Sequence, residues 1–234
     1  MIRLANAWRI PGSGSVNLNI AKPSSASVTV HRVGAEARLD SGRWLDRDVV
    51  FKQRVVKSYR HPDLDRTLQT ARMRNEARLM FEARKAGIPV PVIYSVDLAD
   101  NRIVMEEISG PRAKDALQTA GDEEAGRICD AIGDICGRLH ANDIVHGDLT
   151  TSNMLVDGDR IVLIDFSLGQ KSSEIEEKGV DMHLLEEAFH SAHHDRAELH
   201  DRVLKAYCRS YDGGEDVLRK VKEIEKRGRY TRKE

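Results

Sequence analysis

The chain has 234 residues, of which 40% are hydrophobic and 32% charged, and its net charge is −1. These values predict a globular protein with one core or two small lobes, and they exclude an overall basic field for nucleic acid. No apolar run approaches the roughly 18 residues of a membrane span, so we expect a cytoplasmic protein without a membrane partner. The cysteines form no CxxC pair and are expected to be reduced, buried thiols (Cys129, Cys136, Cys208).

The first half of the chain has the pattern of a small antiparallel sheet with one long helix. Residues 1–27, with several Pro, Gly and Ser, are expected to form an extension or linker. A helical pattern runs from Leu64 to Ala86, and Gly87 is well placed to end it. Alternating or β-branched runs predict strands at 27–33, 35–40, 48–56, 89–97 and 102–108.

The second half is mainly helical. Apolar residues recur at helical spacing in 123–143, and further helices are predicted at 181–192, 197–211 and 216–228. The segment "MLVDGDRIVLIDF" (154–166) predicts two short strands joined by an Asp-Gly turn. The fold class is therefore α+β. The expected division is a β-rich lobe, a helical lobe and a basic tail (28–108, 109–228, 229–234).

Three polar residues surround the predicted hairpin. Asn153 lies just before its first strand and Asp165 just after its second, so pairing of the strands brings the two together. An amide oxygen and a carboxylate are ligands suited to Mg²⁺. Asp148, in "VHGDLTTSNML", is placed to orient a hydroxyl or a water for attack on a phosphoryl group. The alternative is that Asp148 and Asn153 only cap turns.

A lysine and a glutamate in the first half are candidates for a buried ion pair. Lys52 interrupts the apolar strand "DVVFKQRVV", where an ammonium group needs an anion. Glu76 shares the apolar face of the long helix and needs a cation. Pairing Lys52 with Glu76 satisfies both and holds the ammonium where nucleotide phosphates can lie. The alternative pairs Glu76 with Arg72, one turn earlier.

Lys52, Glu76, Asp148, Asn153 and Asp165 occur in the order typical of the protein-kinase fold, which the chain resembles. The His-Gly-Asp of 146–148 replaces the His-Arg-Asp of ordinary protein kinases, as it does in aminoglycoside-kinase-type phosphotransferases. Other segments are similar to the small atypical kinase of the KEOPS (EKC) complex, the PRPK family. They are "GAEARL" (34–39), "KSYRHPDLD" (57–65), "RNEARLMFEARKAGIPVP" (74–91), "VMEEISG" (104–110), "KGVDMHLLEEAFHS" (178–191) and "RGR" (227–229).

The resemblance implies a bilobal kinase-like fold with a reduced helical C-lobe that binds ATP and Mg²⁺ between the lobes. It also implies autophosphorylation and a main role as an ATPase in KEOPS, which makes threonylcarbamoyladenosine on tRNA. Implied partners are the metal-binding, transferase-like catalytic subunit and a small adaptor subunit. By position, Asp148 would be the catalytic aspartate, Lys52 would hold the phosphates and pair with Glu76, and Asn153 with Asp165 would bind Mg²⁺.

The resemblance also assigns an adenine-binding hinge and a reduced phosphate loop. Gly34 would stand in that loop, and the hinge would comprise Met105, Glu106, Glu107 and Ile108.

The segment after Asp165 favours ATP hydrolysis over protein phosphorylation. Only 15 residues separate Asp165 from Asp181, and they contain no Ala-Pro-Glu motif. An ordinary kinase uses a longer segment there to dock a peptide. Asp181 would brace the catalytic loop, the alternative being a helix N-cap. Ser167 stands where the family usually has glycine, which is expected to restrict flipping of this segment but leaves Asp165 in place.

Two regions carry clustered cations that are candidate tRNA contacts. One is the C-terminal stretch 219–234, where Tyr230 replaces the usual lysine of the family's Arg-Gly-Arg-Lys ending, and the alternative is a solvated helix face. The other is the long helix, with Arg66, Arg72, Arg74, Arg78, Arg84 and Lys85.

A cluster of histidines, His190, His193 and His194, raises the question of a metal site. No acidic or cysteine partner is identified at helical spacing, so these residues are interpreted as exposed or structural. Two other functions remain open for the whole chain: a small-molecule phosphotransferase and a scaffolding pseudokinase. Retention of all five kinase-like residues argues against the scaffold.

Overall fold

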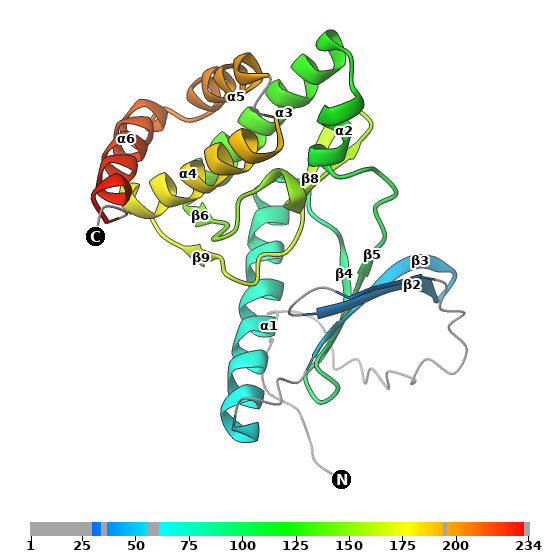
Figure 1. The fold of residues 1–234 in the computed structure, drawn as a ribbon. Helices are drawn as coiled ribbons and strands as arrows, with labels where there is room; N and C mark the ends of the chain where they lie inside the picture. The colour runs from blue at the N-terminus through cyan, green and yellow to red at the C-terminus, as the bar shows by residue number, and fades with distance from the viewer. Residues whose placement is uncertain (1–29, 34–36, 56–60, 194–195, 232–234) are drawn as a thin grey trace.

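The computed structural model describes residues 30–33, 37–55, 61–193 and 196–231. Within them, a sheet lies at one end of the molecule and most helices gather at the other (Figure 1). The predicted α+β class is confirmed. The predicted extension of residues 1–27, Gly34 and His194 lie outside the described residues.

The sheet has five described antiparallel strands in the spatial order β1-β2-β3-β5-β4. They are β1 (Val30–Val33), β2 (Ala37–Trp44), β3 (Arg47–Arg54), β4 (Ile93–Asp97) and β5 (Arg102–Glu106). Lys52 pairs with Leu39 on one side and Ile103 on the other, which places it in the middle of the sheet. The strand predicted at 89–97 begins only at Ile93, because Pro89 and Pro91 lack the N–H groups that a ladder needs.

The long helix α1 (Pro62–Lys85) packs next to the sheet (Figure 1). Pro62 at its first turn suits a helix start, where the missing N–H leaves no hydrogen bond unmade. Gly87 follows its end with a φ of 74°, as predicted for a helix stop. The buried face of α1 carries Glu76 among apolar residues, so its carboxylate needs partners inside the protein.

Five described helices form the second lobe (Figure 1). They are α2 (Ala113–Thr119), α3 (Asp122–Ala141), α4 (Ile175–Ala192), α5 (Ala197–Ser210) and α6 (Gly214–Thr231). The sequence did not predict α2, a helix of seven residues. Helix α4 begins six residues before the predicted start at 181, and α6 runs on through the first residues of the predicted basic tail.

Short β-elements pack mainly against the helices of the second lobe. A hairpin of β7 (Met154–Asp157) and β8 (Arg160–Leu163) forms as predicted, with Gly158 in its turn. A 3-10 turn, η1 (Thr151–Asn153), precedes β7, and β6 (Ile144–Val145) pairs with β9 (Gln170–Lys171). These β-pairs flank the polar segments 146–153 and 164–169.

One hydrophobic cluster extends through both lobes, with Leu79 of α1, Ile132 of α3, Leu185 of α4 and Val203 of α5 among its members. The cysteines are free thiols, and Cys129 and Cys136 are buried as predicted, whereas Cys208 is partly exposed. Burial raises the pKa of Cys129 to about 12, so this thiol stays protonated. Among the described helices, none is long and apolar enough to cross a membrane.

Candidate active site

The hairpin brings Asn153 and Asp165 together at its open end. Met154 pairs with Leu163 in the ladder, and beyond it the Ile164 N–H donates to the Asn153 carbonyl at 3.0 Å. Asp165 is the next residue, with a left-handed φ of 64°. The side chain of Asp165 remains 40% exposed, so it can contact a ligand. Strand pairing alone thus produces the predicted neighbours.

Asp148 and Asn153 are joined directly. The Asn153 Nδ2 donates to Oδ2 of Asp148 at 2.7 Å and to the Asp148 backbone carbonyl at 2.9 Å. Because the amide nitrogen of Asn153 is used in this way, its oxygen is the atom left for a metal ion. These bonds tie Asp148 to the start of the hairpin, and a role of the pair beyond capping this turn stays a prediction.

Lys52 connects the sheet, α1 and the hairpin. Its Nζ lies 2.5 Å from Oε1 of Glu76 and 3.0 Å from Oδ1 of Asp165. The other oxygen of Glu76 accepts from Arg54 at 2.9 Å. The Lys52 and Glu76 side chains are buried, so the interaction acts in a low-dielectric environment. The predicted pairing of Lys52 with Glu76 is present.

The charges of this cluster stabilise one another. Burial by itself would lower the pKa of Lys52, but Glu76 and Asp165 raise it above its ordinary value. Burial likewise opposes ionisation of Asp165, yet the Lys52 ammonium and hydrogen bonds from Ser167 lower its pKa to about 2. Asp165 is therefore a carboxylate, and Lys52 an ammonium, at any pH near neutrality.

Asp181 holds the segment that carries Asp148. Its Oδ2 accepts from the His146 N–H at 2.5 Å, and its Oδ1 accepts from the Gly147 N–H at 2.8 Å. The residue lies well inside α4 and is fully buried, so the alternative interpretation as an N-cap is wrong. Buried backbone N–H groups need such acceptors, since an unmade hydrogen bond costs about 1–3 kcal/mol. Asp181 thus braces the loop.

Replacing Asp181 by Asn is expected to destabilise the protein by about 2–4 kcal/mol, because an amide presents only one acceptor oxygen to two backbone donors. Urea unfolding measures the loss, and hydrogen exchange at His146 and Gly147 reports the local opening. Asp134→Asn is the matched control, because Asp134 is half exposed and pairs with Arg138 at the surface. Equal losses in both variants would contradict the bracing role.

The conformation and surroundings of Gly147 explain why glycine stands between His146 and Asp148. Its φ is +78°, and a Cβ atom there would overlap the Leu168 carbonyl oxygen. The approach of Leu168 brings the segment after Asp165 onto the loop before Asp148. A side chain at position 147, such as the arginine of ordinary protein kinases, does not fit this arrangement.

Gly147→Ala is expected to cost about 2–4 kcal/mol, the sum of left-handed strain and the clash with Leu168. Gly158→Ala separates the two contributions. Gly158 has a similar φ of +60°, but a Cβ atom there would meet no other atom within 4 Å, so only the strain of about 1–2 kcal/mol applies. Thermal unfolding of both variants provides the comparison, and equal losses would exclude the contact as a cause.

The predicted hinge lies at the end of β5. Met105 is buried in the sheet. Glu106 makes two hydrogen bonds with the backbone of Val92: the Glu106 N–H donates to the Val92 carbonyl, and the Glu106 carboxylate accepts from the Val92 N–H. Glu107 accepts from the Ser41 hydroxyl at 2.6 Å. Ile108 follows as the chain leaves the sheet for the second lobe. Adenine binding by this segment stays a prediction, as does the role of Gly34.

Two residues of the cluster were not identified from the sequence. Arg54, the second partner of Glu76, is two residues after Lys52 and so points to the same side of β3. Asn75 donates from its side chain to the Gly169 carbonyl at 2.7 Å and so links α1 to the segment after Asp165. The two-residue period of a strand could have identified Arg54, because it places residues 52 and 54 on the same side of the sheet. Nothing in the sequence indicates the contact of Asn75.

Ser167 occupies its position without left-handed strain, because the described residues with positive φ do not include it. Its N–H approaches Oδ1 of Asp165 at 3.4 Å. The observed backbone conformation therefore accommodates serine at position 167, where the family that the chain resembles usually has glycine. Whether this limits flipping of the segment stays a prediction.

The interpretation that the histidines of 190–194 have no acidic partner at helical spacing is wrong. His190 is exposed and His193 is buried against Phe189, but an acidic residue does lie at helical spacing: Glu186 precedes His190 by four residues. His200 of α5 joins these two in the fold. Helical spacing alone was enough to find Glu186, whereas His200 is brought in by packing.

Comparison with known proteins places this geometry in a family. The family model described as the RIO domain matches residues 22–182. A crystal structure of the Rio2 kinase–ADP/Mg²⁺–phosphoaspartate complex from Chaetomium thermophilum has a TM-score of 0.60 with 14% identity, covering 88% of this chain and 72% of that one. This likeness confirms the kinase-like fold.

The curated relatives identify a smaller family within the RIO-domain family. A "KEOPS complex subunit Bud32" of Pyrococcus abyssi is 42% identical over 185 residues, 78% of this chain and 84% of the relative. A "probable bifunctional tRNA threonylcarbamoyladenosine biosynthesis protein" of Methanothermobacter thermautotrophicus is 43% identical over 199 residues, 85% of this chain. The chain spans only 36% of that bifunctional relative. The predicted family is confirmed: the chain belongs to the RIO-domain family and, within it, to the Bud32 family of KEOPS subunits.

Proposed function

We propose that the chain binds ATP with Mg²⁺ and acts mainly as an ATPase that supports threonylcarbamoyladenosine formation on tRNA. The observation that carries the proposal is the contact of Lys52 with both Glu76 and Asp165. It joins a fixed cation to an ionised carboxylate at the junction of the lobes. A cation for phosphates and an anion for a metal are the two requirements of phosphoryl transfer.

The donor set fits Mg²⁺. Asp165 is ionised and partly exposed, and Asn153 has its amide oxygen available, so both offer the hard oxygen ligands that this ion prefers. When bound, Mg²⁺ would neutralise charge on the phosphates. Lys52 would hold the phosphates, and the backbone of Met105 to Ile108 would contact adenine.

Asp148 is proposed to orient the attacking group. Asn153 fixes its carboxylate at 2.7 Å, and Asp181 holds the backbone of the preceding two residues. A carboxylate positioned in this way can accept a hydrogen bond from a hydroxyl or water and take its proton. Water, or a group presented by a partner, is the proposed acceptor. The segment between Asp165 and α4 holds only the two-residue strand β9, which leaves little surface to dock a peptide.

KEOPS partners are proposed because a relative is named as a KEOPS complex subunit. The specific partners that the family resemblance implies are a transferase-like, metal-binding catalytic subunit and a small adaptor subunit. For tRNA, exposed cations follow α1, with Arg66, Arg74, Arg78, Arg84 and Lys85 all at the surface. Lys226 and Arg227 are exposed near the end of α6. Clustered surface cations of this kind bind phosphates in a salt-dependent manner. Such a protein is expected to act in the cytoplasm.

The test is Mg²⁺-dependent phosphate release from ATP, measured with and without the KEOPS partners and tRNA. Release that rises with partners and is lost in Asp165→Ala supports the coupled ATPase. If wild type stays at the level of Asp165→Ala in every condition while ATP still binds, a scaffold is favoured. Phosphate transfer to an added aminoglycoside or other small alcohol would instead favour the small-molecule phosphotransferase.

A further inference from the structure

A second cluster of ligand-type side chains lies away from the candidate active site, between α4, α5 and α6. Nitrogen atoms of His190 and His200 and a carboxylate oxygen of Glu186 all lie within 4.8 Å of one another. A second set shares Glu186 and adds His183 and Glu225 under the same distance limit. These residues come from three helices, so the fold and not one local motif brings them together.

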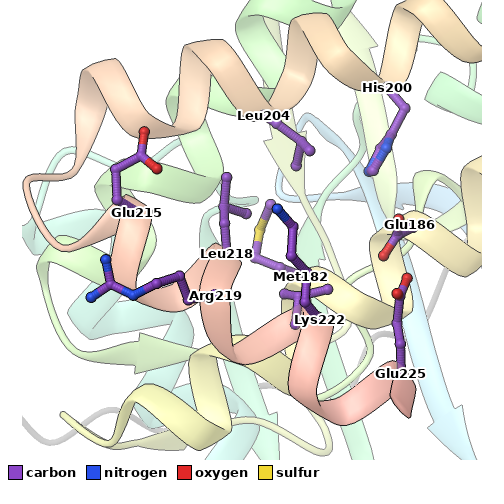
Figure 2. Close-up of a pocket in the computed structure, with 10 residues that line it drawn as sticks. Met182, Glu186, His200, Leu204, Glu215, Leu218, Arg219, Lys222 and Glu225 are labelled. Atoms are coloured by element: carbon purple, nitrogen blue, oxygen red, sulfur yellow. The ribbon is translucent and has the colours of Figure 1, made fainter.

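The cluster borders a cavity of about 230 Å³. Figure 2 shows the carboxylates of Glu186 and Glu225 facing each other, with the ring of His200 directed towards Glu186. Met182, Leu204 and Leu218 supply apolar walls. The cavity thus combines a hydrophobic surround with oxygen and nitrogen donors at one side, an arrangement that strengthens binding of a small cation.

His200 gives independent evidence that a ligand is needed. It is 7% exposed, and its Nε2 is buried without a hydrogen-bond partner. The Nδ1 of His183 is also buried without a hydrogen-bond partner, while its Nε2 lies 3.8 Å from a carboxylate oxygen of Glu187. A buried polar atom left in this state costs free energy, so the buried His200 ring, which is directed towards Glu186, indicates a missing ligand.

The arrangement of charges points to a cation. The carboxyl groups of Glu186 and Glu225 face each other at the cavity, and two like charges placed in this way repel each other unless a cation lies between them. Two cations also line the cavity, but Arg219 is paired with Asp216, so Lys222 supplies one positive charge against the carboxyl groups of Glu186 and Glu225. A bound divalent ion would neutralise both carboxylates and use the histidine nitrogens at the same time.

We propose that Glu186, His190 and His200 bind one divalent transition-metal ion, best matched by Zn²⁺, with Glu225 or His183 completing the coordination. Imidazole nitrogen combined with carboxylate oxygen suits Zn²⁺, whereas Mg²⁺ prefers oxygen alone. Glu186 and His190 are four residues apart on one face of α4, a spacing that lets both bind the same ion. Tetrahedral ligands with bonds of about 2.0–2.1 Å are roughly 3.4 Å apart, within reach of small side-chain rotations.

The proposed ion is structural. It would join α4 to α5 through His200, and α6 to both if Glu225 takes part. Lys226 and Arg227 follow Glu225 directly, so the ion would fix the helix end from which these exposed cations project. This inference does not depend on ATP hydrolysis, since none of its residues contacts Lys52, Asp148, Asn153 or Asp165 in the described contacts.

The experiment is titration of the metal-stripped full chain with Zn²⁺ by calorimetry, in buffer that contains excess Mg²⁺. One Zn²⁺ per chain is expected, and at a free concentration 100 times Kd the Tm should rise by about 5–10 °C. His190→Gln should weaken binding by more than the roughly 10–100-fold that loss of an outer-shell partner costs. Because His190 is exposed, this variant should fold normally.

Two controls make the result specific. His61→Gln removes an exposed histidine next to α1 and should leave Zn²⁺ affinity unchanged. Lys222→Ala removes a cation from the cavity but no ligand, so it should bind Zn²⁺ at least as tightly as wild type. Co²⁺ should give the visible bands of a tetrahedral site in wild type and not in His190→Gln. Absence of binding to wild type, or equal binding by wild type, His190→Gln and Glu186→Gln, would overturn the proposal.

Discussion

Asp148→Asn should lower the rate of Mg²⁺-dependent ATP hydrolysis by about 10²–10⁴-fold, the usual contribution of a positioned proton acceptor. The amide keeps an oxygen that can accept from Asn153, so the loop should stay folded. ATP affinity is expected to change little, because the proposed phosphate contacts are made by Lys52. Single-turnover hydrolysis together with equilibrium ATP binding separates the two effects.

The matched control for Asp148→Asn is Asp157→Asn. Asp157 lies at the far end of the same hairpin and pairs with Arg160 at the surface, so its loss should leave turnover unchanged. A rate for Asp148→Asn within about threefold of wild type would support the turn-capping alternative, since a positioned proton acceptor contributes far more than this. It would remove Asp148 from the proposed mechanism.

Glu76→Leu is expected to reduce the free energy of unfolding by roughly 3–5 kcal/mol, because it leaves the buried side chains of Lys52 and Arg54 without their shared carboxylate. Urea denaturation monitored by circular dichroism measures the change. Lys52 keeps its contact with Asp165, which places the expected loss nearer the lower limit.

Two further variants test this explanation of Glu76→Leu. Glu123→Leu breaks an exposed pair with Arg127 and should cause only a small loss. The triple variant Lys52→Met, Arg54→Met, Glu76→Leu removes all three charges and should recover much of the stability, although not ATP binding. If Glu76→Leu were no more harmful than Glu123→Leu, the buried pair would not be contributing.

Much of the site follows from local pattern. Asn153 and Asp165 are neighbours because a hairpin of known register joins them, and register is a property of a short segment. The face of α1 that carries Glu76 follows from helical period. Boundaries were less accurate: α4 begins at Ile175 although its first turns lack a clear apolar stripe. There, packing against α6 stabilises the helix beyond what its own sequence indicates.

The sequence by itself determined the α+β class, the hairpin, the long helix, and the order of Lys52, Glu76, Asp148, Asn153 and Asp165. The elements depend on periodicity within single segments, and the order of the five residues can be read directly along the chain. Only the tertiary structure decided that Asp181 accepts hydrogen bonds from the N–H groups just before Asp148 and that Leu168 leaves no space beside Gly147. It also decided that His200 meets Glu186. These contacts join residues distant in the chain, and their geometry is set by how packed helices and strands approach one another.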